Sequence, residues 1–398
     1  MNAHAPILVL SAWIPALSAL FGALVGSFLN VCIYRLPLDL SVRTPSRSFC
    51  PSCKRTLPWW ENIPILSWLL LRARCAGCKT PIPCRYPLVE ALTAFLFWGA
   101  SVQLHSQPLL VLLPVFTLVS LLIVATFIDI EHMIIPNEIT WGGVGAALLF
   151  SLLIPALHGV SSPLQGLAQS LLGAALGYGL LWAIAELGHL LLGKKRVSFP
   201  EPTPTLWTRK GEEADLQIGE ETTAWGDFFF RGSEEVHMGI LSGEIDGREL
   251  TESEAVWTLN QLRIETEIET ETEEQTVVQT FDLNQTDRVR LQIMWLVFPR
   301  EAMGFGDVKF LAAIGAFLGW KAVLFTLMAG CSAGALIGSL LKLSKKNAGA
   351  IPFGPYLAFG ALLWIAAGPA MVQAYWQWVT HAAHIPPLPP LSLPALLP

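Results

Sequence analysis

Two aspartates that lie far apart in the chain have surroundings that could support acid–base chemistry. Asp129 follows the apolar run 115–128, and Asp307 precedes the apolar run 310–318. An ionisable group at the edge of a lipid bilayer is expensive to bury and usually marks function. Two carboxyl groups that share a narrow, partly hydrated gap cannot both ionise cheaply, so one can activate a water while the other polarises a carbonyl. This is the acid/base arrangement of aspartic proteolysis.

Each aspartate also has a purely structural interpretation. Aspartate is a common N-cap residue, and Asp307 stands where a helix should begin. Gly304 and Gly306, just before it, leave the backbone bare where another segment could approach. Pro136 follows soon after Asp129. The glycines beside one acid and the proline after the other favour function over capping.

The composition indicates a membrane protein. Of the 398 residues, 53% are hydrophobic and 14% are charged, and the mean hydropathy is +0.51. A soluble domain keeps roughly a quarter of its residues charged. The formal net charge of -6 comes from acids concentrated between 212 and 287, so it predicts no nucleic-acid surface. No Lys or Arg precedes the first apolar run, which favours a retained first span over a secretory signal.

We predict an all-α polytopic fold of about eight transmembrane helices, each from about 20 apolar residues. The expected spans are 7–34, 88–104, 109–128, 139–156, 166–192, 310–318 continuing toward Trp320, 323–343 and 356–379. Lys and Arg concentrate in the connections after the first, fifth and seventh spans, with Lys321 as the outer exception. The positive-inside rule then places both termini outside, and Asp129 and Asp307 at one depth on the cytoplasmic side.

The chain divides by composition into six segments. We expect a first span (1–34), a Cys-rich cytoplasmic loop (35–87), spans two to five (88–193), an acidic cytoplasmic insert (194–300), spans six to eight (301–380) and a Pro-rich tail (381–398). Within the insert, residues 262–269 alternate with period two, which predicts exposed strands and a small, mostly β module. Its acidic run is either an interaction site or a solvated face.

Four of the seven cysteines form two C-x-x-C pairs, Cys50 with Cys53 and Cys75 with Cys78. This spacing is typical of the two knuckles of a structural zinc ribbon. In a reducing compartment four thiolates would close a tetrahedral zinc site without an open position, so the metal would be structural. Four unconnected thiols are the alternative. Cys84 lies just beyond and is not expected to be a ligand.

Four stretches together resemble bacterial prepilin peptidases, a family of membrane aspartic proteases with a GxGD signature. They are 26–37, 128–137, 301–320 with its Gly304-Phe305-Gly306-Asp307 motif, and 351–356. The resemblance implies a protein of the bacterial inner membrane that removes the short basic leader of type IV prepilins or type II secretion pseudopilins. It further implies that Asp129 and Asp307 are the catalytic pair and that the active site faces the cytoplasm.

The same resemblance implies a second activity, methylation of the new N-terminus with S-adenosylmethionine. No glycine-rich nucleotide loop is present, so no cofactor-binding residue is assigned. Two features depart from the family: Asn137 stands where a second acid is frequent, which removes a possible local contact, and the insert replaces a short basic connection. The implied partners are the prepilin or pseudopilin and the bilayer, with pilus or secretion assembly proteins as candidates for the insert.

Several further residues could support the site. Lys309 lies within one helical turn of Asp307 and could tune its ionisation, bind a substrate carbonyl or snorkel to the headgroups. Pro352, Gly354 and Pro355 break the backbone before the last span, and such irregularity at membrane depth is tolerated where it borders protein or water. We expect these three residues to shape a substrate cleft.

Two other classes stay open at this stage. A proton-coupled transporter could use Asp129 and Asp307 as a relay, and it would require paired inverted halves with broken helices. A zinc-bearing scaffold without catalysis would depend on the cysteines and not on the acids. Glu90, at the start of the second predicted span, has only a local interpretation, as a helix cap.

Overall fold

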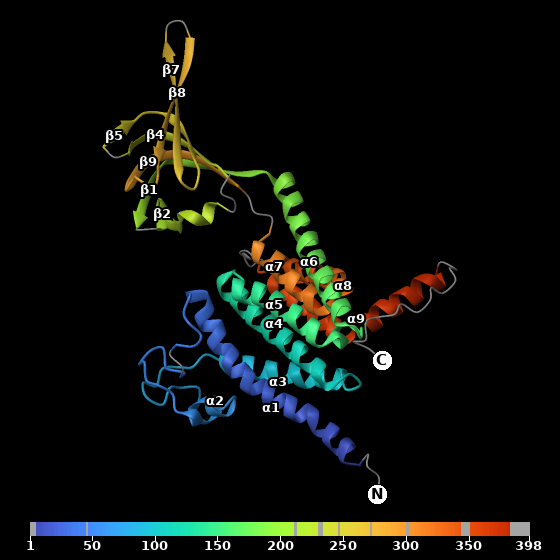
Figure 1. The fold of residues 1–398 in the computed structure, drawn as a ribbon. Helices are drawn as coiled ribbons and strands as arrows, with labels where there is room; N and C mark the ends of the chain where they lie inside the picture. The colour runs from blue at the N-terminus through green and yellow to red at the C-terminus, as the bar shows by residue number, and fades with distance from the viewer. Residues whose placement is uncertain are drawn as a thin grey trace. The chain divides into compact units, whose positions relative to one another are not determined.

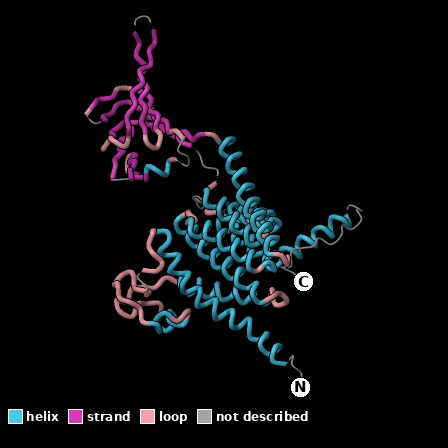
Figure 2. The backbone as a smooth tube through the Cα atoms, viewed as in Figure 1, coloured by secondary structure: helices cyan, strands magenta, loops and turns pink. Residues whose placement is uncertain are grey.

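The structure is a computed structural model that describes residues 5–44, 47–210, 213–229, 234–245, 247–270, 273–299, 303–343 and 351–382. It divides into two units, one formed by Met1–Trp182 with Gly304–Pro398 and the other by Ala183–Met303. Helices dominate the first unit and strands the second (Figure 2). The Pro-rich tail predicted at 381–398 lies almost entirely outside the described residues.

The helical unit follows the order of the predicted spans (Figure 1). Its helices are α1 (Ala5–Arg35), α2 (Leu66–Leu70), α3 (Arg85–Gln103), α4 (Leu112–His132), α5 (Asn137–Leu153), α6 (Pro163–Leu192, whose last turns belong to the second unit), α7 (Phe305–Leu318), α8 (Trp320–Leu343) and α9 (Gly354–Ala382). Short 3-10 helices are η1 (Leu36–Leu38), η2 (Trp59–Asn62), η3 (Leu109–Val111) and η4 (Pro155–His158). Each of the eight predicted spans is thus a helix, and α2 lies in the Cys-rich loop.

Five helical stretches among the described residues are long and apolar enough to cross a membrane. They are Trp13–Leu38, Leu109–His132, Pro163–Leu191, Trp320–Leu343 and Gly354–His381. The other three helices in the predicted spans, α3, α5 and α7, hold 19, 17 and 14 residues. The chain is therefore a helical membrane protein.

Helix α7 is the most enclosed helix of this unit. Every residue from Phe310 to Leu318 is buried. On α6, Gly173 faces Gly315 of α7 so closely that a Cβ on either glycine would lie 2.0–2.2 Å from the other residue's carbonyl oxygen. Small residues allow helix backbones to approach in this way inside a membrane protein. The α6–α7 contact thus fixes the helix that carries Asp307.

The ends of α7 differ from the sequence prediction. The helix begins at Phe305, so Asp307 lies inside its first turn and does not precede it. The predicted continuation toward Trp320 is wrong, because the helix stops at Leu318 and Gly319 turns the chain with φ +79°. The next helix then starts at Trp320, three residues earlier than the predicted span.

The second unit contains one antiparallel sheet of nine strands, which confirms the mostly β insert. The strands are β1 (Lys194–Lys210), β2 (Glu213–Ile218), β3 (Glu221–Ala224), β4 (Val236–Ile245), β5 (Arg248–Leu250), β6 (Ser253–Trp257), β7 (Gln261–Thr270), β8 (Glu273–Asp282) and β9 (Arg288–Pro299), with η5 at Trp225–Phe228. Their order is β3-β2-β1-β9-β4-β6-β7-β8, and β5 pairs with β4. Trp207, Trp225 and Trp257 are buried in its hydrophobic core, so the insert has a core of its own.

Candidate active site

Asp129 lies in the last turn of α4 and faces the start of α9. The helix ends when Met133 adopts a left-handed conformation, with φ 56°, and donates its N–H to the Asp129 carbonyl. The Asp129 side chain is 5% exposed, and its Oδ2 accepts a hydrogen bond from the Gly354 N–H at 2.9 Å. Gly354 is the first residue of α9, where backbone N–H groups lack helical partners and carry partial positive charge. The start of α9 therefore stabilises the ionised form of Asp129.

Asp307 lies in the first turn of α7 and is 9% exposed. The N-cap is Gly304, with extended backbone angles (φ -64°, ψ 135°) and no capping side chain. Asp307 is therefore not the N-cap residue that the structural interpretation requires. A carboxylate in the first turn is favoured by the helix dipole. Asp307 therefore lies at the N-terminus of its own helix, whereas Asp129 lies at the end of α4 and faces the N-terminus of α9.

The two aspartates line one cavity of about 440 Å³, which we call the aspartate cavity. Its other walls come from η1 and the residue after it, the α4–α5 connection with the start of α5, and the start of α7. A Cβ at Gly306 would lie 3.3 Å from Ile135 Cβ, so this glycine allows the α7 start to pack against the connection that follows Asp129. Gly304 lines the same cavity, but the nearest atom to its Cβ position is Asp307 Oδ2 at 3.6 Å.

Lys309 points back toward the α4–α5 connection. Its Nζ donates a hydrogen bond to Asn137 Oδ1 at 2.9 Å and lies 4.9 Å from the centre of the Phe305 ring. Both Lys309 and Asn137 line the aspartate cavity. Asn137 therefore makes a local contact of its own, through its amide oxygen.

The three residues before the last helix differ in what they contact. Gly354 contacts Asp129 directly. None of the three, Pro352, Gly354 or Pro355, is among the described residues that line the aspartate cavity, so their role in shaping a substrate cleft stays a prediction. Two further carboxylates line the cavity, Glu138 and Asp39, and Asp39 was not singled out from the sequence. Asp39 follows η1 in a left-handed conformation with φ 52°, and the buried Arg35 holds the adjoining loop by donating to the carbonyls of Ser41 and Val42. An acid next to the 26–37 stretch was its only signal in the sequence.

The four predicted metal ligands form one cluster. The Sγ atoms of Cys50, Cys53, Cys75 and Cys78 all lie within 4.8 Å of one another, and Cys50 and Cys78 are 3.7 Å apart. Four sulfur atoms around a tetrahedral zinc at 2.3 Å would be separated by about 3.8 Å. The donor set and the spacing therefore fit zinc. Cys84 is exposed and is not part of the cluster.

The two C-x-x-C pairs have matching backbone geometry. In the first, the Cys50 N–H donates to the Arg55 carbonyl and the Lys54 N–H donates to Cys50. In the second, Cys75 has the same relation to Thr80 and Lys79. Hydrogen bonds with the Thr80 hydroxyl and backbone lower the pKa of Cys78 to about 6. Backbone hydrogen bonds also lower the pKa of Cys75, whereas burial and the neighbouring thiols raise the pKa of Cys53 to about 11. The second C-x-x-C pair thus favours thiolate, the form that binds metals.

Glu90 does not cap a helix. Helix α3 begins at Arg85, so Glu90 lies within it, and its Oε2 accepts a hydrogen bond from the Ile65 N–H at 2.7 Å. Glu90 is 7% exposed, which makes it a buried carboxylate at the contact between α3 and the Cys-rich loop.

The fold and this site define a helical membrane protein in which two buried aspartates share one cavity and four cysteines form a separate cluster. Comparison with family models identifies the group. Residues 20–104 match the bacterial peptidase A24 N-terminal domain, and residues 116–199 and 289–339 match the type IV leader peptidase family. The chain belongs to the type IV leader peptidase family. Its two matched segments are separated by residues 200–288, which fall in the β unit.

Curated relatives carry one name, prepilin leader peptidase/N-methyltransferase. The chain is 32% identical to that of Myxococcus xanthus (strain DK1622) over 330 residues, 82% of this chain and 63% of the relative. It is 29% identical to that of Aeromonas hydrophila over 377 residues, 87% and 89% of the two chains. For Neisseria gonorrhoeae the identity is 37% over 209 residues, 47% of this chain and 70% of the relative. No solved structure matches the chain.

Proposed function

We propose that this chain is a membrane aspartic endopeptidase that removes the leader peptide of type IV prepilins or type II secretion pseudopilins. The observation that carries the proposal is the aspartate cavity, where α4 and α7 bring Asp129 and Asp307 together although they are far apart in the chain. Family membership and the relatives' names support the substrate class. Neither supports the proton-coupled transporter.

The chemistry follows from placing two carboxyl groups in one partly buried cavity. Like charges at close range cannot both ionise cheaply, so the pair carries one proton. The ionised member removes a proton from a water, the water attacks the scissile carbonyl, and the protonated member donates a hydrogen bond to the carbonyl oxygen. The Gly354 N–H holds one oxygen of Asp129, which leaves the other oxygen for the water.

The proposed topology has eight spans in the bacterial inner membrane, with both termini in the periplasm and the aspartate cavity facing the cytoplasm. At 1.5 Å per residue, the 14 residues of α7 cover about 21 Å, less than the roughly 30 Å hydrocarbon core. Its burial supports a span despite this length, because backbone enclosed by other helices need not match the bilayer. The basic connections described above support the orientation.

The remaining segments receive separate roles in this proposal. The Cys-rich loop, 35–87, holds a structural zinc through the four clustered thiolates. The relatives' names support N-methylation of the mature substrate with S-adenosylmethionine. The insert, 194–300, is a separate module with its own core and is a candidate site for pilus or secretion assembly proteins.

The test is leader removal from a co-expressed prepilin. Asp129→Asn and Asp307→Asn should each abolish processing, because neither variant can form a pair that shares one proton. The mass of the mature N-terminus then reports the cleavage site and any added methyl together. Processing by either variant at the wild-type rate would refute the acid pair. A scaffold without catalysis predicts instead that both Asp variants are silent and that Cys50→Ser disrupts function.

A further inference from the structure

Helix α2, in the Cys-rich loop, turns its leucines away from the rest of the protein. Leu66, Leu69 and Leu70 are 55%, 57% and 79% exposed. Positions i, i+3 and i+4 share one side of a helix, so these three leucines form one face. Ser67, on another side of α2, is buried. A surface helix of a globular protein has the opposite arrangement, with its apolar side toward the core.

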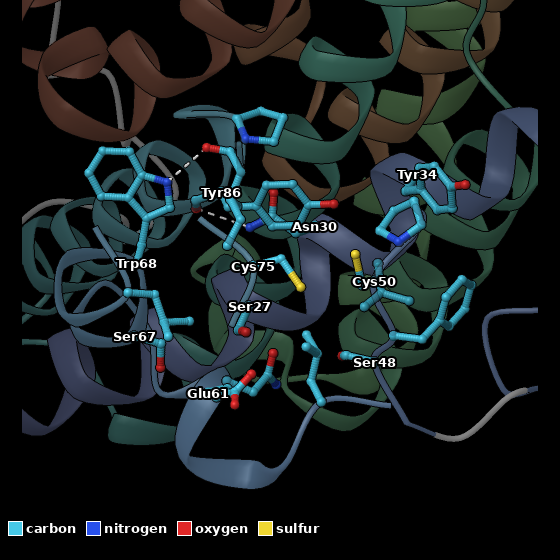
Figure 3. Close-up of a pocket in the computed structure, with 18 of the residues that line it drawn as sticks. Ser27, Asn30, Tyr34, Ser48, Cys50, Glu61, Ser67, Trp68, Cys75 and Tyr86 are labelled. Carbon is cyan, nitrogen blue, oxygen red and sulfur yellow. Dashed lines mark hydrogen bonds between the residues drawn. The ribbon is translucent and has the colours of Figure 1, made fainter. Parts of the chain in front are cut away.

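The inner side of α2 faces a cavity that lies between α1, the Cys-rich loop and α3. Ser67, Trp68 and Leu71 line this cavity, and the three exposed leucines are not among the described residues that line it. Figure 3 shows Ser67 and Trp68 in this lining. Trp68 Nε1 donates to the Ile82 carbonyl at 3.1 Å. This bond fixes the orientation of α2, so its leucine face stays turned outward.

Two tryptophans in η2 add to the exposed apolar surface. Trp59 and Trp60 are 76% and 57% exposed, and their ring centres are 5.8 Å apart. Ser67 Oγ donates to the Trp60 carbonyl at 2.9 Å, which joins η2 to α2. A group of exposed apolar side chains marks an interaction surface for a protein or a membrane. We call this group the loop patch; it consists of Trp59, Trp60, Leu66, Leu69 and Leu70.

Hydrogen bonds hold the loop patch near the end of the first apolar helix. The Ile65 N–H, just before α2, donates to Glu90 Oε2 on α3 at 2.7 Å. One turn earlier on the chain, the Tyr86 carbonyl accepts from Asn30 Nδ2 at 3.1 Å. Asn30 belongs to the last third of Trp13–Leu38, a stretch apolar and long enough to cross a membrane. The start of α2 therefore lies at the level where this stretch leaves the bilayer.

The Cys-rich loop also carries an excess of positive charge. Its two acids are Asp39 and Glu61, and Glu61 already pairs with Arg55. Arg72 and Arg74 follow α2 within four residues. Four exposed basic side chains of the loop form no ion pair with any described residue: Lys54, Arg72, Arg74 and Lys79. Basic segments beside a membrane helix are attracted to anionic lipid headgroups.

We propose that the loop patch docks the Cys-rich loop onto the surface of an anionic lipid bilayer. The leucines and tryptophans enter the boundary between headgroups and acyl chains, where tryptophan is enriched, and Arg72 and Arg74 reach the phosphates. The exposed leucine face, the basic residues next to it and its level beside the first apolar helix together favour lipid over a soluble partner. Because η1 belongs to the same loop and lines the aspartate cavity, docking also restricts the movement of that wall.

The first experiment maps lipid contacts of the full-length chain in nanodiscs that hold one copy. The lipid is phosphatidylcholine mixed with phosphatidylglycerol, with a phospholipid that carries a photoreactive diazirine near the carbonyl end of its acyl chain. After irradiation, peptide mass spectrometry should find label in 59–70 as well as in 13–34, and none in 221–224 of the β unit. Label in 13–34 without label in 59–70 would overturn the proposal. Loss of the 59–70 label on addition of an equimolar prepilin would assign the loop patch to the substrate and also overturn it.

A triple variant tests the leucine face. Leu66→Gln, Leu69→Gln and Leu70→Gln together should lower the label in 59–70 at least fivefold relative to that in 13–34. The Tm in detergent should match that of the wild type, because these side chains point away from the protein. Leu241→Gln, at an exposed leucine of strand β4, is the matched control and should leave the label unchanged. An unchanged label in the triple variant would reject the leucine face as the docking surface.

A change of lipid tests the charge. In nanodiscs of phosphatidylcholine alone, the label in 59–70 should fall at least twofold relative to that in 13–34. Arg72→Gln with Arg74→Gln should remove this difference between the two lipid mixtures, whereas Arg248→Gln, on strand β5, should keep it. Equal labelling of the wild-type chain in both mixtures would overturn the assignment to an anionic surface.

Discussion

Replacing Gly354 by alanine should impair catalysis, because a methyl group at this position would collide with Asp129. An alanine Cβ would lie 2.7 Å from Asp129 Oδ2, 3.3 Å from its Cγ and 3.1 Å from Ile135 Cδ1, whereas ordinary contacts begin at 3.4 Å. The carboxyl group would have to move by about 0.7 Å, the difference between 3.4 and 2.7 Å. This movement would displace Asp129 relative to Asp307 and to the attacking water.

The size of the effect follows from the sensitivity of catalysis to geometry. A misplacement of 1 Å costs about 100-fold in rate, so a shift of about 0.7 Å predicts roughly 25-fold. This corresponds to about 2 kcal/mol of activation free energy. If the shift also breaks the hydrogen bond from the Gly354 N–H to Asp129, a further loss of about 1.5–3 kcal/mol is expected, since the acceptor is charged.

The assay is the initial rate of leader removal from a purified prepilin by the detergent-solubilised chain, followed by mass spectrometry. Gly142→Ala on α5 is the matched control, because no atom lies within 4 Å of its Cβ position. Gly304→Ala is a second comparison within the GxGD motif, where the Cβ would meet Asp307 Oδ2 at an ordinary 3.6 Å. We expect kcat/KM to fall at least 25-fold for Gly354→Ala and less than threefold for Gly142→Ala, with a smaller loss for Gly304→Ala than for Gly354→Ala. A kcat/KM for Gly354→Ala within threefold of wild type would refute the steric argument.

Three further predictions concern stability and metal binding. Gly173→Ala should lower the Tm strongly, because its Cβ would lie 2.0 Å from the Gly315 carbonyl oxygen. Gly179→Ala, on the same helix, has open space around its Cβ position and should not lower the Tm. Equal Tm values for the two variants would contradict the α6–α7 contact. The purified chain should contain one zinc ion, measured by elemental mass spectrometry. Cys75→Ser should lose this zinc, whereas Cys84→Ser should keep it. An unchanged zinc content in Cys75→Ser would exclude the cluster as the zinc site. Burial lowers the pKa of His158 from 6.5 to about 4. Between pH 6.5 and 4 the unfolded chain binds a proton at this histidine that the folded chain does not bind. The free energy of unfolding should therefore fall by up to about 3 kcal/mol as the pH drops from 6.5 to 4. His158→Gln should flatten this pH dependence in thermal melts, and an unchanged slope would reject the cause.

Much of the site was predictable because its signals are local in the chain. The apolar runs beside Asp129 and Asp307, with the distribution of basic residues, predicted two acids at one depth before any contact was known. The structure places both on the aspartate cavity. The C-x-x-C spacing similarly predicted the cluster that the four Sγ atoms form. The strand prediction for the insert is confirmed for the same reason, since alternation of side chains is a property of neighbouring residues.

Other features could not be read from local patterns. The role of Gly306 was partly predicted, because the bare backbone does meet another segment, at Ile135. Asp39 and Glu90 were missed or misjudged because their neighbours belong to other elements: η1 turns Asp39 toward the aspartate cavity, and Glu90 bonds to Ile65 instead of capping α3. The end of α7 was also misplaced, since a glycine with positive φ within an apolar run interrupts the helix without changing hydropathy.

The amino-acid sequence by itself determined the membrane character, the two acids, the thiolate set and the β insert, because hydropathy, charge and spacing act over a few neighbouring residues. Only the tertiary structure decided what each acid contacts. The hydrogen bond from Gly354 to Asp129 joins positions 225 residues apart. The hydrogen bond from the Ile65 N–H to Glu90 likewise joins the Cys-rich loop to α3. Such contacts arise from the close packing of whole helices, which no short stretch of sequence encodes.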